Sequence, residues 1–528
     1  MRRFERVAEA ADDLTTVGRL ARDLPNFLRT RITREQAWAE VRAALQTRDE
    51  RFLWLVDRAI YAQPRSPYRA LLQHAGCELG DVRRLVQHEG LDGALSHLLD
   101  RGVYVTDDEM KGRQPIVRGS LRLTPSGADF RSRIVQPHVM MLTGGSSGRA
   151  ARVPRTLRSW EMHAANQAIH HDVHGVFGVT LASWVMNPAS PFISWNRIGN
   201  PLAHWLLPLS PLPLSARIGA QLLGVLGRRA GVRFPPPTPC EIDQPETMAR
   251  VISTLRARHG RVSVSCATSA AVRAAMAARD RNISLAGVTF DVRSEPLTEA
   301  RRQDIEAAGA HVIGAYGSNE ITYVAFTCAN RRAADDMHLF AHEYALTTSP
   351  RETGVDGETV QGLHVTTLSP FAPVIGLNAQ MGDVATVEER DRDCCPLGGI
   401  GLTTHLSNIR SYDKLTGEGV TVARSDMLRV LEVELPRRFG GASVDYQLAE
   451  EAGPDSLVRL VLRISPRVGA LDEDAARAAL LAGLDNGGLV DRHMAMLWRQ
   501  AGTVVIRREE PRATAAGKVL PFHRDRRA

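Results

Sequence analysis

Residues 283–316 constrain the fold most strongly, because a strand, a helix and a second strand follow one another there. Residues 283–291 and 310–316 are short apolar runs, and residues 297–308 between them have apolar positions at helical spacing. Two strands joined by a helix run parallel in one sheet. The chain therefore predicts an α/β domain whose ligand site lies beyond the carboxyl ends of these strands.

The rest of the chain divides into parts around this unit. Residues 1–105 have helical periodicity, and we expect a mostly helical region packed on a large core domain of residues 106–409. Residues 410–528 alternate short strands and helices, typical of a small α+β domain. The predicted fold class is thus α/β plus α+β: a large domain with parallel or mixed sheets flanked by helices, preceded by a helical region and followed by a small domain.

The composition excludes several classes of protein. The 528 residues carry 66 basic and 59 acidic side chains, which gives a net charge of +7 and indicates a globular chain with no nucleic-acid partner. Six cysteines are too few for a disulfide scaffold, and the charged residues 4–22 do not form a signal segment, so we expect a cytoplasmic protein. Four prolines interrupt the apolar residues 201–226, so no transmembrane segment is expected.

A glycine-rich loop follows a predicted buried strand at residues 139–143. Its backbone N–H groups and hydroxyls could hold phosphate oxygens, although an ordinary turn has the same composition. The loop also matches the Gly-x-Ser-x-Gly pattern of a hydrolase nucleophile, with Ser146 as the serine and His405, His493 or His523 as its base. The loop residues are Thr143, Gly144, Gly145, Ser146, Ser147 and Gly148.

Three further motifs carry chemistry. An aromatic residue, small polar residues and a carboxylate end the 310–316 strand, where they could stack a base, touch a phosphate and hold Mg²⁺. Asp383 follows a tight turn and could accept ribose hydroxyls. Lys518, one of only three lysines, ends a loop of small residues and could neutralise negative charge. The strand-end motif comprises Tyr316, Gly317, Ser318, Asn319 and Glu320.

In this order, the motifs resemble the adenylate-forming superfamily of acyl-CoA synthetases, carrier-protein adenylation domains and luciferases. The resemblance covers residues 66–521 and is greatest to the phenylacetate–CoA ligase and acyl-protein synthetase branch. It implies an ATP-dependent, AMP-forming acid ligase: a carboxylate attacks the α-phosphorus of ATP, pyrophosphate leaves, and the acyl-adenylate passes to a thiol of CoA or a carrier protein. It also implies that the small C-terminal domain is mobile between the two steps.

The resemblance also implies a role for each motif. The glycine-rich loop would hold the β- and γ-phosphates, Ser294, Glu295, Pro296 and Tyr316 would flank adenine, and Glu320 would bind Mg²⁺. Asp383 and Arg410 would hold the ribose, and Lys518 would bridge the substrate carboxylate and the α-phosphate. A structural zinc, which some relatives carry, would have as ligands Cys328, His338, Cys394 and Cys395.

Several points stay open at this stage. Large apolar side chains between residues 184 and 205 favour an aromatic or aliphatic acid, and four histidines at positions 163–174 are assigned to polar faces of a helix. Ser294 stands where the family has glycine, and Tyr412 where it has the hinge acid or lysine. The alternatives are an adenylating enzyme with an amine acceptor or a non-carboxylate substrate, a hydrolase using Ser146, and an inactive nucleotide-binding scaffold.

Overall fold

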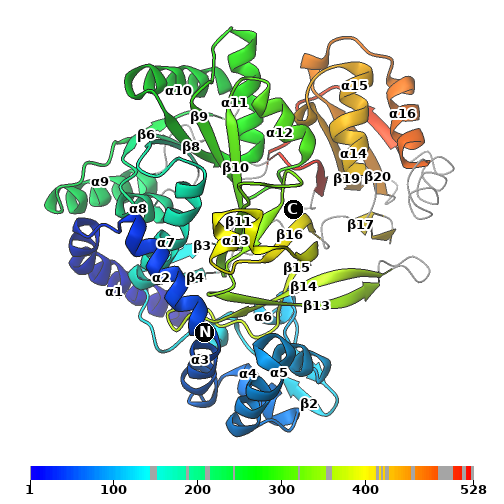
Figure 1. Cartoon of the computed structure of the whole chain (residues 1–528). Helices are drawn as coiled ribbons and strands as arrows, with labels where there is room; N and C mark the ends of the chain where they lie inside the picture. The colour runs from blue at the N-terminus through cyan, green and yellow to red at the C-terminus, as the bar shows by residue number, and fades with distance from the viewer. Residues whose placement is uncertain are drawn as a thin grey trace.

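The computed structural model has a large mixed sheet at its centre (Figure 1). It describes residues 2–142, 152–185, 189–207, 214–241, 244–318, 321–352, 359–411, 416–417, 420–421, 427–452, 458–485, 504–513 and 519–524. Within these ranges the large sheet has 12 strands in the order β13-β14-β15-β16-β12-β11-β10-β9-β8-β5-β6-β7. The pairs from β7 to β10 are parallel and those from β10 to β13 are antiparallel, so the predicted mixed sheet is confirmed.

The strands of the large sheet have these bounds: β5 (Thr180–Trp184), β6 (Leu202–Leu207), β7 (Pro237–Pro239), β8 (Val262–Ala267), β9 (Val288–Arg293), β10 (His311–Ser318), β11 (Thr322–Thr327), β12 (Met337–Leu339), β13 (Tyr344–Glu352), β14 (Thr359–Thr367), β15 (Ala379–Glu389) and β16 (Thr404–Ser411). Short two-stranded pairs lie outside it: β1 (Ile116–Arg118) with β2 (Leu121–Leu123), β3 (Val139–Leu142) with β4 (Arg152–Arg155), and β17 (Thr416–Gly417) with β18 (Val420–Thr421).

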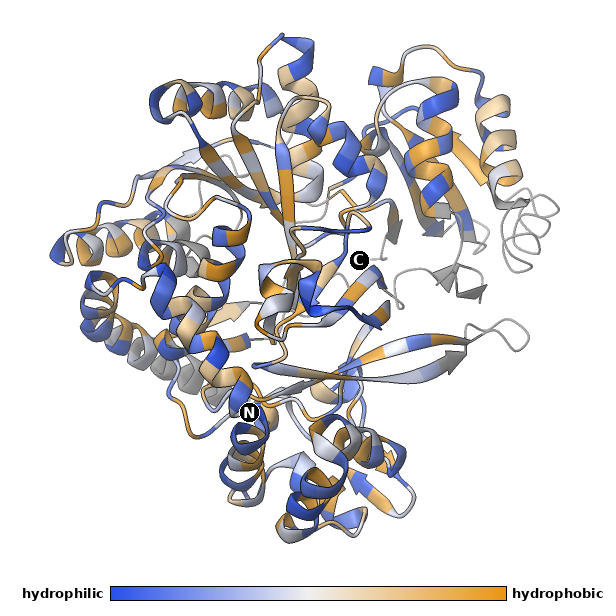
Figure 2. Ribbon diagram, viewed as in Figure 1, coloured by the Kyte–Doolittle hydropathy of each residue, from blue (hydrophilic) through white to orange (hydrophobic). Residues whose placement is uncertain are grey.

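Helices cover both faces of the parallel half of the sheet. One face packs against α10 (Pro245–His259), α11 (Thr268–Asp280) and α12 (Glu299–Glu306), and the other against α7 (Leu157–Val173) and α8 (Ala189–Arg197). Because strand side chains alternate between faces, apolar residues fill both layers, and apolar strands run through the centre of Figure 2. The remaining helices of this part are α9 (Leu214–Arg229) and the short η2 (Gly127–Phe130), η3 (Arg392–Cys394) and α13 (Pro396–Gly399).

The predicted strand–helix–strand unit is confirmed as β9, α12 and β10. β9 and β10 are parallel, with Val292 opposite Gly314, so the residues two positions further, Ser294 and Tyr316, reach the same edge of the sheet. The Thr298 hydroxyl accepts the N–H of Arg301 and caps the start of α12. The local sequence thus sets the edge at which two predicted motifs meet.

The N-terminal part is helical through residue 110. Phe52, Leu72 and Leu95 lie in one apolar cluster with Ala345 and Leu377 of the core, so these helices pack on the large sheet's antiparallel half. The limit at residue 105 stays a prediction. The helices are α1 (Arg2–Arg29), α2 (Arg34–Gln46), α3 (Arg48–Leu55), the π-helix η1 (Val56–Tyr61), α4 (Pro67–His74), α5 (Leu79–Asp100) and α6 (Asp107–Met110).

The C-terminal part has its own four-stranded sheet in the order β21-β20-β19-β22 and its own apolar core, as the α+β pattern predicts. The expected limit between residues 409 and 410 falls inside β16, so this limit also stays a prediction. The elements are α14 (Met427–Arg429), the π-helix η4 (Val430–Glu434), α15 (Leu435–Phe439), η5 (Ser443–Asp445), β19 (Tyr446–Ala452), β20 (Val458–Ile464), η6 (Pro466–Val468), α16 (Glu473–Asp485), β21 (Val504–Arg507) and β22 (Phe522–Arg524).

Two further expectations concern the histidines of α7 and the absence of a transmembrane segment. The polar-face assignment of the histidines on α7 is wrong for His163, His170 and His171, which are buried against the sheet. The rings of His163 and His170 pack on Phe326 of β11, and His171 Nε2 lies 3.3 Å from Asp291 Oδ2 of β9. Burial lowers the pKa of His163 to about 3, so this ring is neutral. No helix in the described part of the chain has the length and apolar character needed to cross a membrane.

Candidate functional site

Tyr316 and Asp383 come together at the carboxyl end of β10. The Tyr316 hydroxyl donates a hydrogen bond of 2.9 Å to Asp383 Oδ2, which reaches it from β15. Burial, together with the Asp383 charge, raises the pKa of Tyr316 well above 10, so the phenol keeps its proton and donates. The structure thus unites two residues that the sequence assigns to one nucleotide site.

Gly317 permits the bulge that ends β10. The register shifts between Tyr316 and Gly317, and a Cβ atom on Gly317 would lie only 1.9 Å from the Thr322 carbonyl oxygen of β11. A glycine is therefore required for β11 to turn back this closely. The bulge directs the strand end, where Ser318 Oγ accepts the N–H of Ile321 at 3.4 Å.

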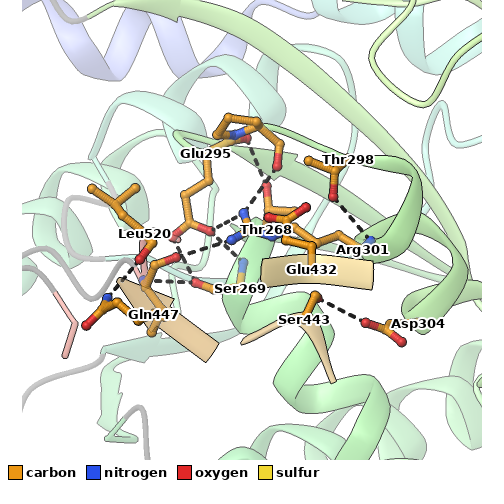
Figure 3. A network of polar contacts seen from close by, with 12 residues as sticks. Thr268, Ser269, Glu295, Thr298, Arg301, Asp304, Glu432, Ser443, Gln447 and Leu520 are labelled. Atoms are coloured by element: carbon orange, nitrogen blue, oxygen red, sulfur yellow. Dashed lines mark hydrogen bonds and ion pairs between the residues drawn. The ribbon is translucent and has the colours of Figure 1, made fainter. Parts of the chain in front are cut away.

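The loop after β9 is fixed by its glutamate. Ser269 donates to the Glu295 carboxylate twice, from its N–H to Oε2 and from Oγ to Oε1, both at 2.8 Å (Figure 3). Because Ser269 lies in the first turn of α11, Glu295 places a negative charge at a helix N-terminus. Arg301 Nη1 lies 3.2 Å from Glu295 Oε2, and the Glu295 side chain has no exposed surface. Glu295 therefore holds the loop, while Ser294 is exposed and has a positive φ of 72°.

The C-terminal tail docks beside this loop. The Val519 N–H donates to Ser269 Oγ at 3.3 Å, and Arg301 Nη2 donates to the Val519 carbonyl at 3.4 Å. The Gln447 amide donates to the carbonyls of Leu520 at 2.8 Å and Arg512 at 3.0 Å, on either side of the tail segment. Lys518 lies outside the described residues. The next residue, Val519, contacts Ser269 and Arg301, which also bind Glu295 in the loop of residues 294–296.

Arg410 points away from the Tyr316–Asp383 pair. It lies opposite Val384 in the β15–β16 register, and Asp383 therefore projects from the other face of the sheet. The guanidinium lies 3.1 Å from Asp335 Oδ2. The structure thus does not bring Arg410 to Asp383, and its ribose role stays a prediction. Predicted residues outside the described part are Thr143, Gly144, Gly145, Ser146, Ser147, Gly148, Asn319, Glu320 and Lys518.

A second cluster gathers the predicted zinc ligands and adds one. Potential ligand atoms of Cys328, His338, Cys394 and His405 all lie within 4.8 Å of one another. Cys395 Sγ, the remaining predicted ligand, lies 3.0 Å from His338 Nε2. A hydrogen bond from Cys328 and the nearby His338 lower the pKa of Cys395 to about 3, and the same bond raises that of Cys328.

The donor set fits a zinc ion. Thiolates and imidazoles are the usual ligands of a closed zinc site, and a carboxylate or carbonyl usually orients each imidazole. His338 Nδ1 lies 2.7 Å from the Leu402 carbonyl oxygen, and His405 Nδ1 lies 2.6 Å from Asp336 Oδ1, which leaves each Nε2 facing the cluster. His405 was not among the predicted zinc ligands, although β12 and β16 pair it directly with His338.

The chain was also compared with known proteins. No protein-family model matches, and no curated protein matches. Among solved structures, ATP-bound MatB from Rhodopseudomonas palustris is similar, with 14% identity over 90% of this chain and 91% of MatB and a TM-score of 0.45. The anthranilate CoA ligase AuaEII in complex with anthranoyl-AMP has 13% identity over 74% of this chain and 66% of its own, and a TM-score of 0.44.

McyG A-PCP complexed with phenylalanyl-adenylate is a third, with 12% identity, coverage of 84% of this chain and 63% of McyG A-PCP, and a TM-score of 0.40. Of these three structures, one holds ATP, one anthranoyl-AMP and one phenylalanyl-adenylate. TM-scores below 0.5 leave the function to be argued from the chain's own residues.

Proposed function

We propose that this protein is an ATP-dependent acid ligase that forms an acyl-adenylate, releases pyrophosphate and transfers the acyl group to a thiol. The observation that carries the proposal is the docking of Val519 on Ser269 and Arg301. This contact joins the segment after Lys518 to the loop of residues 294–296, at the sheet edge that also holds Tyr316 and Asp383. Acid activation by ATP needs a carboxylate that binds the ribose and a lysine that neutralises developing negative charge, both in the same site.

Each residue has a role in this proposal. The Tyr316 ring packs against adenine, and Asp383, oriented by the Tyr316 hydroxyl, accepts the ribose hydroxyls. Lys518 neutralises the charge that develops between the carboxylate and the α-phosphate. The glycine-rich loop from Thr143 to Gly148 binds the outer phosphates, and Glu320 binds the Mg²⁺ that accompanies ATP. The acid is aromatic or aliphatic, and the thiol belongs to CoA or a carrier protein.

Exchange of labelled pyrophosphate into ATP tests the first half-reaction. We expect exchange that depends on an acid from a panel of benzoate, phenylacetate and octanoate, and its loss in Lys518→Ala. Lys111→Ala is the matched control, because Lys111 directly follows α6 and forms an ion pair with Asp107 of that helix. Absence of exchange with every acid, or full exchange in Lys518→Ala, would contradict the proposal. Labelling of Ser146 by a serine-reactive phosphonate would favour the hydrolase instead.

We propose, secondly, that a zinc ion occupies the cluster of Cys328, His338, Cys394 and His405, where it would join β11, β12, β16 and the segment around η3. The observation in favour is the convergence of two thiols and two oriented imidazoles within 4.8 Å. Metal analysis of the purified protein should find one zinc per chain. Cys394→Ser should lose it, whereas Cys77→Ser, a buried cysteine outside the cluster, should retain it.

A further inference from the structure

Arg301 is a buried arginine shared by two carboxylates from different parts of the chain. It lies in α12, and its side chain is 1% exposed. Its Nη1 is 3.2 Å from Glu295 Oε2 in the loop before α12, and its Nε is 3.2 Å from Glu432 Oε1 in η4 of the C-terminal part. The two glutamates are 0% and 3% exposed, so three charged groups lie out of solvent and depend on one another.

The same guanidinium also binds two backbone carbonyls. Nη1 donates to Pro296 at 3.2 Å, and Nη2 donates to Val519 at 3.4 Å (Figure 3). A planar fork with five donors can serve several partners at once, which an ammonium cannot do in the same geometry. One side chain therefore connects the loop of residues 294–296, the π-helix η4 and the C-terminal tail.

A second contact joins α12 to the C-terminal part. Ser443 Oγ donates to Asp304 Oδ2 at 3.1 Å, one helical turn beyond Arg301. Since Glu432, Ser443 and Val519 all follow β16 in the sequence, α12 is one of the helices to which this later part of the chain is attached; α11 is another, through Ser269. Loss of the Arg301 cation would leave Glu295 and Glu432 buried without their counterion, so Arg301 is the charged group on which these contacts between the two parts depend.

We propose that Arg301 is the positioning residue that holds the C-terminal tail at Val519, the residue after Lys518, against the loop of residues 294–296 for acid activation. This inference rests on the proposed function. Arg301 acts through Val519 and Glu432 and does not itself touch the substrate. Its replacement should therefore release the tail and slow adenylation without removing the groups that bind ATP.

Hydrogen exchange of the full-length protein, followed by mass spectrometry, tests the structural half of this inference. In Arg301→Met, the Val519 N–H, which donates to Ser269 Oγ, should exchange about tenfold faster, while β9 in the core and β20 and β22 in the C-terminal sheet keep their protection. Arg302→Met is the matched control, since Arg302 pairs with Glu299 and Glu306 within its own helix. Unchanged protection of the Val519 N–H, or a loss spread over the whole chain, would overturn the inference.

Conservative variants separate positioning from folding. Arg301→Lys keeps the charge but cannot reach all the partners, so it should free the tail as Arg301→Met does. Glu432→Ala should also free it, whereas Glu434→Ala should not, because Glu434 is partly exposed in the same element and pairs with Arg429. Equal effects of the two glutamate variants would contradict a role for the buried pair.

Kinetics test the catalytic half. In pyrophosphate exchange with the panel acids, Arg301→Met should lower kcat about tenfold and leave the KM for ATP within about twofold, while Arg302→Met changes neither. A free tail with wild-type kcat would show that Arg301 does not position the tail for catalysis. If the wild type exchanges no pyrophosphate, the proposed function fails, but hydrogen exchange still decides whether Arg301 holds the tail.

Discussion

Ser294 holds a backbone conformation that residues other than glycine rarely adopt. Its φ of 72° is left-handed, and its side chain is exposed, so the strain is not balanced by buried contacts of that side chain. Ser294→Gly should therefore raise the free energy of unfolding by about 1 kcal/mol, measured by urea denaturation. Ser284→Gly, an exposed serine without a positive φ, should lower it. Equal changes in the two variants would refute strain at Ser294.

The Tyr316–Asp383 hydrogen bond makes a prediction about ATP affinity. Asp383→Asn keeps the shape of the side chain but removes the charge that would accept ribose hydroxyls. The Kd for ATP, measured by titration calorimetry, should rise about tenfold, which corresponds to about 1.4 kcal/mol. Asp391→Asn, an exposed aspartate just beyond β15, is the control. An unchanged Kd in Asp383→Asn would exclude Asp383 from the nucleotide site.

At the scale of elements, the sequence predicts what local periodicity determines. The β9–α12–β10 unit follows from alternating apolar runs, and its parallel register brings Ser294 and Tyr316 to one edge. The buried histidines of α7 could not be predicted in this way, because they face β9 and β11, which lie more than a hundred residues later in the sequence. His171 Nε2 lies 3.3 Å from Asp291 Oδ2, and the His170 ring packs on Phe326. Local patterns carry no information about such a distant partner.

The candidate site shows the same limit. Motif order brings Tyr316 and Asp383 to one site in the prediction, and the structure joins them. Motif order does not reveal that the Glu295 carboxylate accepts the Ser269 N–H at the start of α11 and pairs with Arg301. These contacts are known only from the fold. His405 was missed as a zinc ligand because only the pairing of β12 with β16 places it opposite His338.

The Cys and His cluster makes a prediction at this same scale. Cys328 directly follows β11, His338 lies within the neighbouring β12, and Cys394 lies in η3, so zinc would join a short helical segment to the sheet. His405→Gln should lose zinc and lower the free energy of unfolding by about 3 kcal/mol when zinc is otherwise saturating. His364→Gln, a buried histidine of β14, should keep its zinc. Retention of zinc in His405→Gln would remove His405 from the ligand set.

For the whole molecule, the helical N-terminal part is attached to the large sheet through a charged contact as well as an apolar one. Arg51 of α3 donates to the His342 carbonyl at 2.8 Å, and its charge acts on the neighbouring Glu343. Glu343 is buried, and burial raises the pKa of its carboxyl to about 7 even though Arg51 acts in the opposite direction. The junction therefore contains a carboxyl that prefers to be protonated in the folded state.

The pH dependence of global unfolding should report this carboxyl. Because its pKa is about 7 when folded and about 4.5 in the unfolded chain, its stabilising contribution is complete below about pH 4.5 and is lost as the pH rises through 7. Between pH 5 and pH 8, the free energy of unfolding of the wild type should fall by about 2.5 kcal/mol relative to Glu343→Gln, measured by urea denaturation. Glu50→Gln, an exposed glutamate beside Arg51, should follow the wild type. Parallel pH curves for the wild type and Glu343→Gln would mean that Glu343 ionises in the folded state as it does in the unfolded chain.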